Sequence, residues 1–133
     1  AGMRIFTEGG VYISLRDHDK TARAAKLMRQ YADEGFKIYA SAGTCRFLTD
    51  HGIPCTAVPF GAVSGMIGDE IQVMINVPQV TNKISTDMFP LRRQAIEKGL
   101  PVLTCMDTAG AYLAAVKLKK AGVTPGYRAI FGA

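Results

Sequence analysis

Long hydrophobic runs are missing from this sequence. No apolar stretch approaches the ~20 residues that a helix needs to cross a bilayer, and Arg4, Glu8 and Arg16 interrupt the N-terminal segment. We therefore expect neither a membrane span nor a signal peptide, and we expect a cytoplasmic protein.

Cysteine is also scarce. The three cysteines, Cys45, Cys55 and Cys105, form no Cys-x-x-Cys pair and no Cys/His ligand spacing. Their odd number and their spacing argue against a disulfide framework and against a zinc site. His18 and His51 match no cysteine or carboxylate pattern either. We expect surface roles for both histidines, reduced and mostly buried thiols, and no metal site.

The chain carries a net positive charge, but its basic residues are not concentrated in one segment. The formal net charge of +5 at pH 7 favours anionic partners. The basic residues are dispersed, however, and no basic stripe with interleaved aromatics indicates nucleic-acid binding. The phosphate-binding patterns G-x-x-x-x-G-K-[ST] and G-x-G-x-x-G are absent too. The expected partner is a small anionic metabolite, with no nucleic acid and no membrane.

What is present is an alternation of strands and helices. With 133 residues, 48% of them hydrophobic, the chain is long enough for one domain with a single core. Apolar runs predict strands at residues 11–15, 36–40, 53–58, 71–76 and 100–104, and helical spacing predicts helices at residues 21–31, 44–50, 86–98 and 109–120. Residues 59–68 contain too much glycine for a long helix and are predicted as a loop. This order predicts an α/β fold with three α/β/α layers and a mainly parallel five-stranded sheet.

Further expectations concern the later helices and the domain limits. Leu91, Ala95 and Ile96 are predicted to face the sheet. Asp107 or Thr108 is predicted to cap the last helix. The expected divisions are a linker at residues 1–10, the domain at residues 11–122 and a C-terminal extension at residues 123–133.

Polar residues follow the first two predicted strands at their carboxyl ends. Asp17-His18-Asp19-Lys20 follows the first strand, and Ser41-Ala42-Gly43-Thr44 follows the second. The carboxyl ends of neighbouring parallel strands face the same crevice, so a lysine, hydroxyls and backbone N–H groups can converge there on one phosphate. The alternatives are ordinary helix capping by the second segment and a solvated lysine in the first. The candidate acid/base groups are Asp17, Asp19 and Asp87, the last of which also suits a helix cap.

Three segments carry a resemblance to a known family. They are Ile13-Ser14-Leu15-Arg16-Asp17-His18-Asp19-Lys20, Gly35-Phe36-Lys37-Ile38-Tyr39-Ala40-Ser41-Ala42-Gly43-Thr44 and His51-Gly52-Ile53-Pro54. Together they resemble the methylglyoxal-synthase-like superfamily, and most closely the C-terminal allosteric domains of carbamoyl-phosphate synthetase large subunits. The resemblance implies a noncatalytic domain, with no cofactor of its own, in an ATP-dependent ligase that makes carbamoyl phosphate for pyrimidine and arginine biosynthesis. The implied partners are the rest of the large subunit and the glutaminase small subunit, and the parent enzyme would use ATP with Mg or Mn.

The resemblance also implies an effector site for a nucleoside monophosphate such as UMP or IMP. The residues implied to hold the phosphate are Lys20, Ser41 and Thr44. The residues implied to line it are Ser14 and, through their backbone, Ala42 and Gly43. The residues implied to lie toward the ribose and base are Asn76 and Asp87.

Two departures from the family pattern leave a carboxylate effector open. Many members have a second phosphate-binding lysine after the third strand, where this sequence has Pro59-Phe60-Gly61. In addition, Val77-Pro78 resembles the Leu-Pro of members that respond to N-acetylglutamate. N-acetylglutamate or a similar carboxylate is therefore an alternative ligand.

Methylglyoxal synthase, which eliminates phosphate from dihydroxyacetone phosphate, is the enzymatic alternative. Asp17 and Asp87 fall at positions that match its carboxylates. Arg16 and Ile84, however, stand where its histidines belong, and the aspartate of its Gly-Gly-Asp segment has no counterpart. Because an electrophile and a base are both missing, catalysis should fall by orders of magnitude. We therefore expect binding without turnover.

Overall fold

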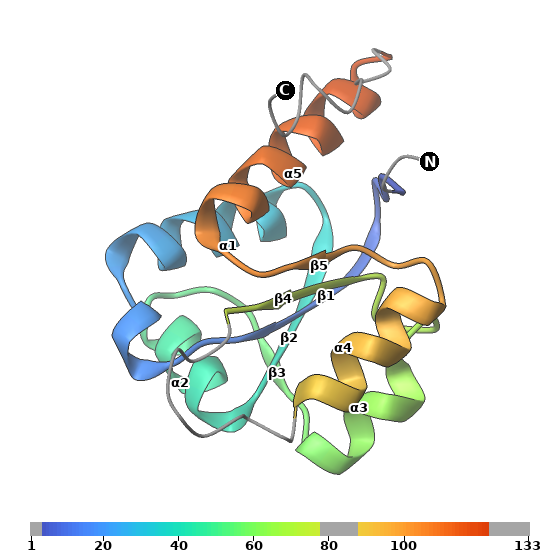
Figure 1. Cartoon of the computed structure of the whole chain (residues 1–133). Helices are drawn as coiled ribbons and strands as arrows, with labels where there is room; N and C mark the ends of the chain where they lie inside the picture. Colours follow the sequence, from blue (N-terminus) through green and yellow to red (C-terminus); the bar gives the residue numbers. More distant parts are fainter. Residues whose placement is uncertain (1–3, 78–87, 123–133) are drawn as a thin grey trace.

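A single parallel sheet forms the centre of the fold. The computed structural model describes residues 4–77 and 88–122, and within them five strands pair in the order β3-β2-β1-β4-β5, every pair parallel. The strands are β1 (Gly9–Ser14), β2 (Phe36–Ala40), β3 (Thr56–Ala57), β4 (Val73–Asn76) and β5 (Val102–Leu103). The predicted five-stranded parallel sheet is confirmed (Figure 1).

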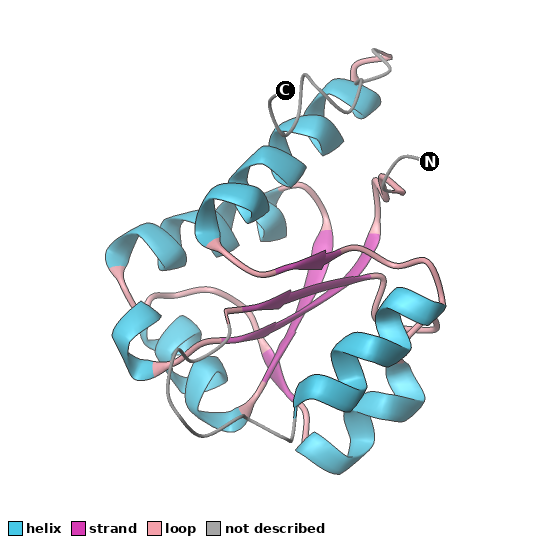
Figure 2. Ribbon diagram, viewed as in Figure 1, coloured by secondary structure: helices cyan, strands magenta, loops and turns pink. Residues whose placement is uncertain are grey.

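Helices cover both faces of this sheet (Figure 2). They are α1 (Ala22–Asp33), α2 (Ala42–Asp50), α3 (Phe60–Met66), α4 (Met88–Glu97) and α5 (Met106–Lys120), with a short 3-10 helix at Asp17–Asp19 before α1. α3 and α4 lie side by side on one face, and α1 and α5 cover the other (Figure 1). The predicted α/β class is therefore confirmed. No helix in the described part of the chain is long and apolar enough to cross a membrane.

The alternation of side chains along β1 divides the core into two layers. Val11 and Ile13 pack with α1 and α5, whereas Tyr12 packs with α3 and α4, and all three are fully buried. Met28 and Tyr31, which recur at helical spacing on α1, are fully buried against the first layer. Burying a large apolar side chain of this kind contributes about 1.5–3 kcal/mol, so both faces of the sheet stabilise the fold.

The glycine-rich segment at residues 59–68 differs from its prediction. It contains α3 rather than a loop. Val63 and Ile67 are fully buried, and Ser64 exchanges two hydrogen bonds of 2.8 Å with Gln94 of α4. The burial of two side chains and the contact with α4 outweigh the low helix propensity of glycine, so the loop prediction is wrong.

Smaller differences concern α4 and the edges of the sheet. Ile96 was expected to face the sheet but is 63% exposed, because Leu91 and Ala95 already fill the buried face of α4. The edge strands β3 and β5 have two residues each, fewer than predicted. Each edge strand pairs with one neighbour only, so fewer backbone hydrogen bonds hold it extended.

β1 begins at Gly9, inside the segment predicted to be a linker. A Cβ atom on Gly10 would lie 2.0 Å from the carbonyl oxygen of Glu70, closer than any real side chain permits. The Gly10 N–H also donates to the Gln72 side chain at 2.7 Å. Glycine is therefore needed here because the segment before β4 passes directly over the start of β1.

Candidate anion site at the carboxyl edge of the sheet

The carboxyl ends of β1, β2 and β4 meet at one edge of the sheet. Ile13 of β1 is in register with Ala40 of β2, and Ser14 of β1 is in register with Asn76 of β4. The strand order changes direction between β1 and β4, since β2 and β3 extend to one side and β4 and β5 to the other. In open α/β sheets such a switch in strand order creates a crevice outside the carboxyl ends, and ligands usually bind in it.

The side chain of Lys20, in the loop after β1, extends toward α2. Its side chain is 21% exposed, and its Nζ lies 2.7 Å from Asp17 Oδ1. The same Nζ lies 3.4 Å from the position that a Cβ atom would take on Gly43. The structure therefore brings the ammonium group against the first turn of α2. Because Gly43 has no side chain, the backbone of this turn remains accessible beside the ammonium.

The first turn of α2 has no side-chain cap. Ser41 is the N-cap residue, but its hydroxyl makes no capping bond and donates to Thr44 Oγ1 at 3.0 Å instead. The N–H groups of Ala42, Gly43 and Thr44 belong to the first turn and have no intrahelical acceptor. Together with the helix dipole and the neighbouring ammonium, they create a positive potential that suits an anion.

Thr44 has a different position from the other predicted phosphate ligands. It is 1% exposed, and its Oγ1 accepts hydrogen bonds from the Leu15 N–H at 3.0 Å and from Ser41. These bonds tie the end of β1 to the start of α2. The Thr44 hydroxyl thus faces the protein in this structure, and its contact with a phosphate stays a prediction.

Ser14 and Asn76 lie side by side at the switch in strand order. Tyr12 and Met74, two residues earlier on the same strands, both pack toward α3 and α4, so Ser14 and Asn76 point to that face as well. Asn76 is 6% exposed. The pair therefore lies at the carboxyl edge of the sheet, on the side of α3 and α4. Asp87 lies outside the described residues.

The carboxylates of the β1 loop already have cationic partners. The hydrogen bond from Lys20 and, next, the attraction of its charge lower the pKa of Asp17 below its usual value. Arg16 pairs with Asp19 at 2.5 Å. The predicted acid/base candidates of this loop are thus counter-ions. This role was not predicted, although the three-residue spacing within each pair could have indicated it.

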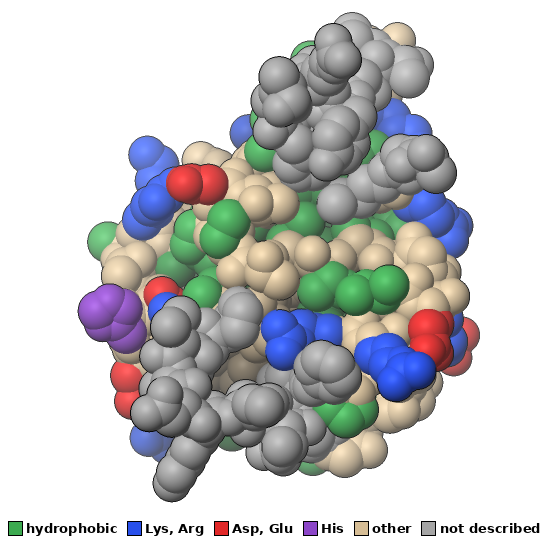
Figure 3. Space-filling view, viewed as in Figure 1, with side chains coloured by type: hydrophobic (Ala, Val, Ile, Leu, Met, Phe, Trp, Pro, Cys, Tyr) green, Lys and Arg blue, Asp and Glu red, His purple; other side chains and the backbone are tan. Residues whose placement is uncertain are grey.

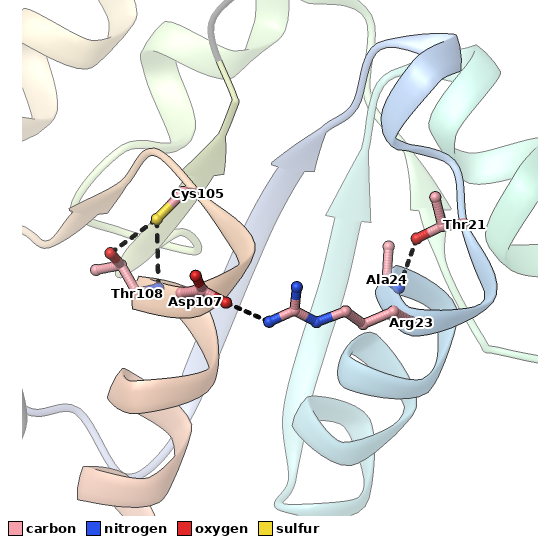
Figure 4. Close-up of polar contacts among 6 residues, drawn as sticks. All are labelled: Thr21, Arg23, Ala24, Cys105, Asp107 and Thr108. Carbon is pink, nitrogen blue, oxygen red and sulfur yellow. Dashed lines mark hydrogen bonds and ion pairs between the residues drawn. The ribbon is translucent and has the colours of Figure 1, made fainter.

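Two of the other helices that begin at this edge, α1 and α5, are capped (Figure 4). At α1, Thr21 Oγ1 accepts from the Ala24 N–H at 3.2 Å. At α5, the sulfur of Cys105 accepts from the Thr108 N–H at 3.4 Å and lies 3.0 Å from its hydroxyl. The first turns of α1 and α5 therefore have acceptors that the first turn of α2 lacks.

The cap of α5 corrects two predictions. Cys105, not Asp107 or Thr108, is the N-cap residue, and Asp107 instead forms an ion pair with Arg23 of α1 (Figure 4). Cys105 is also exposed, whereas Cys45 and Cys55 are half-buried, so the expectation of mostly buried thiols is wrong for Cys105. A cysteine cap is hard to predict because Ser, Thr, Asp and Asn are the usual N-cap residues.

The basic side chains are spread over the visible surface. On the face in Figure 3, Lys and Arg form separate groups rather than one continuous stripe. Positive potential at the carboxyl edge therefore depends on local groups, which are the ammonium of Lys20 and the N–H groups of α2.

The chain is thus a small α/β domain with a candidate anion site at the carboxyl edge of its sheet, where the strand order changes. The family model of the MGS-like domain matches residues 23–104. This range is more than half of the chain, and the chain belongs to the MGS-like domain family.

Two curated relatives carry the same name. The chain is 38% identical to the carbamoyl phosphate synthase large chain of Clostridium acetobutylicum over 132 residues, which is 98% of this chain and 12% of that protein. It is 35% identical to the carbamoyl phosphate synthase large chain of Thermoplasma volcanium over 111 residues, which is 77% of this chain and 10% of that protein. The predicted resemblance to the MGS-like domain of such large chains is confirmed. The chain spans only about a tenth of the length of these relatives.

Proposed function

We propose that this chain is the allosteric effector-binding domain of a carbamoyl phosphate synthase large chain and binds a nucleoside monophosphate such as UMP or IMP by its phosphate. Its parent enzyme would be a cytoplasmic ligase that uses ATP with Mg or Mn and works with a glutaminase small subunit in pyrimidine and arginine biosynthesis. The relatives named above support the parent enzyme. The site at α2 supports the anionic ligand.

The observation that carries the proposal is the Lys20 ammonium beside the uncapped first turn of α2. A cation gains nothing from the positive end of a helix dipole unless an anion lies between them. Asp17 is the present partner of this ammonium, but its side chain is 99% exposed. An ion pair with so exposed a partner contributes little in water. A phosphate that also accepts from the backbone N–H groups of α2 can therefore replace it.

The neighbouring polar groups suit the rest of a nucleotide. Ser41 has a hydroxyl that needs only a rotamer change to donate to a phosphate rather than to Thr44. Ser14 and Asn76 lie along the same edge of the sheet, toward which a ribose and base would extend. Asp87, which the family resemblance also implies, stays a prediction.

Regulation requires more than binding. A ligand changes activity only if it binds two states of the whole enzyme unequally. The domain therefore supplies the binding energy, and the rest of the large chain must respond to it.

The two alternatives have less support. A carboxylate effector such as N-acetylglutamate would use the same ammonium and N–H groups but would form fewer bonds, because a carboxylate has fewer acceptor oxygens than a phosphate. Methylglyoxal synthesis would need a strong base, and the lowered pKa of Asp17 makes this carboxylate a weaker one.

Calorimetry with UMP, IMP, N-acetylglutamate and ornithine tests the proposal. Lys20→Met removes the ammonium, and Lys26→Met removes an exposed charge from α1 as a matched control. We expect Lys20→Met to weaken UMP or IMP binding by about 10- to 100-fold, the usual worth of a charged hydrogen bond, and Lys26→Met to leave it nearly unchanged. Equal affinities of the two variants would overturn the phosphate site. Formation of methylglyoxal from dihydroxyacetone phosphate would favour the enzyme instead.

A further inference from the structure

Two of the three thiols lie together, close to the anion site but outside it. Cys45 is on α2, and Cys55 lies in the segment before β3. The Cys45 thiol donates to the carbonyl oxygen of Cys55 at 3.5 Å, and the two thiols are close enough for Cys45 to influence the pKa of Cys55. Both cysteines are free and half-buried.

The backbone between them holds this pair in place. α2 ends at Asp50, and Gly52, with a φ of +74°, turns the chain back along the helix. The Ile53 N–H donates to the carbonyl of Leu48 at 3.0 Å, and both side chains are buried. The two cysteines therefore lie close together because a tight, anchored turn returns the chain beside α2.

The surroundings of Cys55 admit a small molecule. A cavity of about 260 Å³ is lined by Cys55 together with Phe36 and Lys37 of β2. Burial, with a smaller contribution from the bond with Cys45, raises the pKa of Cys55 to about 12. Cys55 is therefore protonated at neutral pH and is a poor first nucleophile.

We propose that Cys45 and Cys55 form a redox-modification site, at which a low-molecular-weight disulfide such as oxidised glutathione converts the two thiols into an internal disulfide. The formation of this disulfide does not rest on the proposed function, whereas its effect on anion binding does. The Cys45 thiolate attacks the oxidant, breaks its S–S bond and releases one thiol. Cys55 then loses its proton, attacks the Cys45 sulfur and releases the second thiol. Two cysteine thiols are oxidised, and one disulfide oxidant is reduced to two thiols.

The disulfide joins α2 to the segment before β3, one turn from the anion site. The Cys45 N–H donates to the carbonyl of Ser41 at 2.7 Å, so a movement of Cys45 also moves the N-cap of α2. An S–S bond is shorter than the present contact between the two residues. Oxidation therefore shifts the first turn of α2 relative to Lys20 and weakens anion binding.

Cys105 provides an internal comparison. It is exposed and lies at the start of α5, where its sulfur contacts Thr108 rather than a second thiol. It can take up glutathione but has no thiol neighbour among the described residues with which to release it. The same oxidant should thus give a mixed disulfide at Cys105 and an internal disulfide between Cys45 and Cys55.

Oxidation of the whole chain with oxidised glutathione, followed by non-reducing peptide mapping, tests the site. We expect a Cys45–Cys55 linked peptide, the loss of two hydrogen atoms in the Cys105→Ser variant, and full reversal by dithiothreitol. Cys45→Ser and Cys55→Ser should each abolish the linked peptide, with folding checked by circular dichroism. Stable glutathione adducts on both Cys45 and Cys55 in the unaltered chain, or a link to Cys105 in their place, would overturn the proposal.

A second measurement tests the effect on the anion site. In the Cys105→Ser background, we expect oxidation to weaken UMP binding at least about threefold and dithiothreitol to restore it. If affinity stays the same, the disulfide has no regulatory effect, and that part of the inference is wrong. If UMP binds neither form, the proposed function fails, but the peptide map still decides whether the disulfide forms.

Discussion

Three of the helices that begin at the carboxyl edge of this sheet, α1, α2 and α5, differ in their first turns. Thr21 caps α1 and Cys105 caps α5, each by accepting a backbone N–H of its own first turn. Serine is also a favourable N-cap residue, yet the hydroxyl of Ser41, the N-cap of α2, donates a hydrogen bond to Thr44 instead of capping the helix. In α1 and α5 a side chain accepts a hydrogen bond from a backbone N–H of the first turn. In α2 the first-turn N–H groups have no side-chain acceptor, and Lys20 lies beside them.

The difference has a physical cause in Thr44. Its buried hydroxyl joins the end of β1 to α2 and attracts the Ser41 side chain. The same link holds the β1 loop, and with it Lys20, close to Gly43. One buried threonine thus accounts for the difference between the first turn of α2, which can bind an anion, and the capped first turns of α1 and α5.

The largest effect should come from removing this link. Thr44→Val keeps the size and shape of the side chain but leaves the buried Leu15 N–H without its acceptor. An unsatisfied buried N–H costs about 1–3 kcal/mol, so we expect the free energy of unfolding in urea to fall by about that amount. Thr49→Val, on the exposed side of α2, is the control and should change it by less than about 0.5 kcal/mol. Equal losses in both variants would contradict a special role for Thr44.

The next effect separates the capped helix from the uncapped one. Thr21→Ala removes a true cap and should destabilise the fold by about 1 kcal/mol, with no change in UMP affinity. Ser41→Ala removes no cap, so it should affect stability less and weaken UMP binding by several-fold. Urea unfolding and calorimetry on the same two variants measure both quantities. The comparison fails if Ser41→Ala destabilises the fold as much as Thr21→Ala while binding is unchanged.

The sequence predicts most of this arrangement but not its details. Alternating strand and helix patterns predict the parallel sheet, and parallel strands necessarily bring the loops after β1 and β2 to one edge. The inward position of Thr44 is not predictable, because its partner Leu15 lies 29 positions away in the sequence and on another element. No local pattern reports such a contact.

Two other misses have different causes. α3 was predicted as a loop because glycine lowers helix propensity, but Val63 and Ile67 are fully buried, and tertiary packing overrides propensity. The cap at Cys105 was missed because preference tables rank oxygen acceptors above sulfur. The role predicted for Asp87, which lies outside the described residues, stays a prediction.

A smaller effect is expected at the counter-ion of Lys20. Asp17 competes with an anion for this ammonium, so Asp17→Asn should tighten UMP binding by about two- to fivefold, the scale of an exposed ion pair. Asp33→Asn removes the same charge from an exposed position on α1 and should have less effect. Calorimetry at low salt gives the clearest difference, because salt screens exposed charges. A weaker affinity of Asp17→Asn would mean that Asp17 helps to bind the ligand.

The pH dependence sharpens the same point. The pKa of Asp17 is lowered, so its ion pair is present above the ordinary carboxyl pKa and is lost only as the pH falls through the lowered value. Asp17 therefore stays ionised and competes equally between about pH 5 and pH 8, while a phosphate monoester gains its second negative charge near pH 6. We expect UMP affinity to rise across this range by the same factor in the unaltered chain and in Asp17→Asn. A different slope in the variant would show that Asp17 titrates there.

The smallest effect concerns the sulfur that caps α5. The bond with the Thr108 hydroxyl and, next, the bond with its backbone N–H lower the pKa of Cys105, which increases the thiolate fraction at neutral pH. Thr108→Val removes the hydroxyl but keeps the N–H, so alkylation of Cys105 by iodoacetamide at pH 7 should slow by roughly two- to fivefold. Mass spectrometry of the Cys105 peptide measures this rate, and the two proteins should converge at a pH where both thiols are ionised. An unchanged rate at pH 7 would mean that the Thr108 hydroxyl does not stabilise the thiolate, and that the backbone N–H of Thr108, which the variant keeps, is the effective partner of the sulfur.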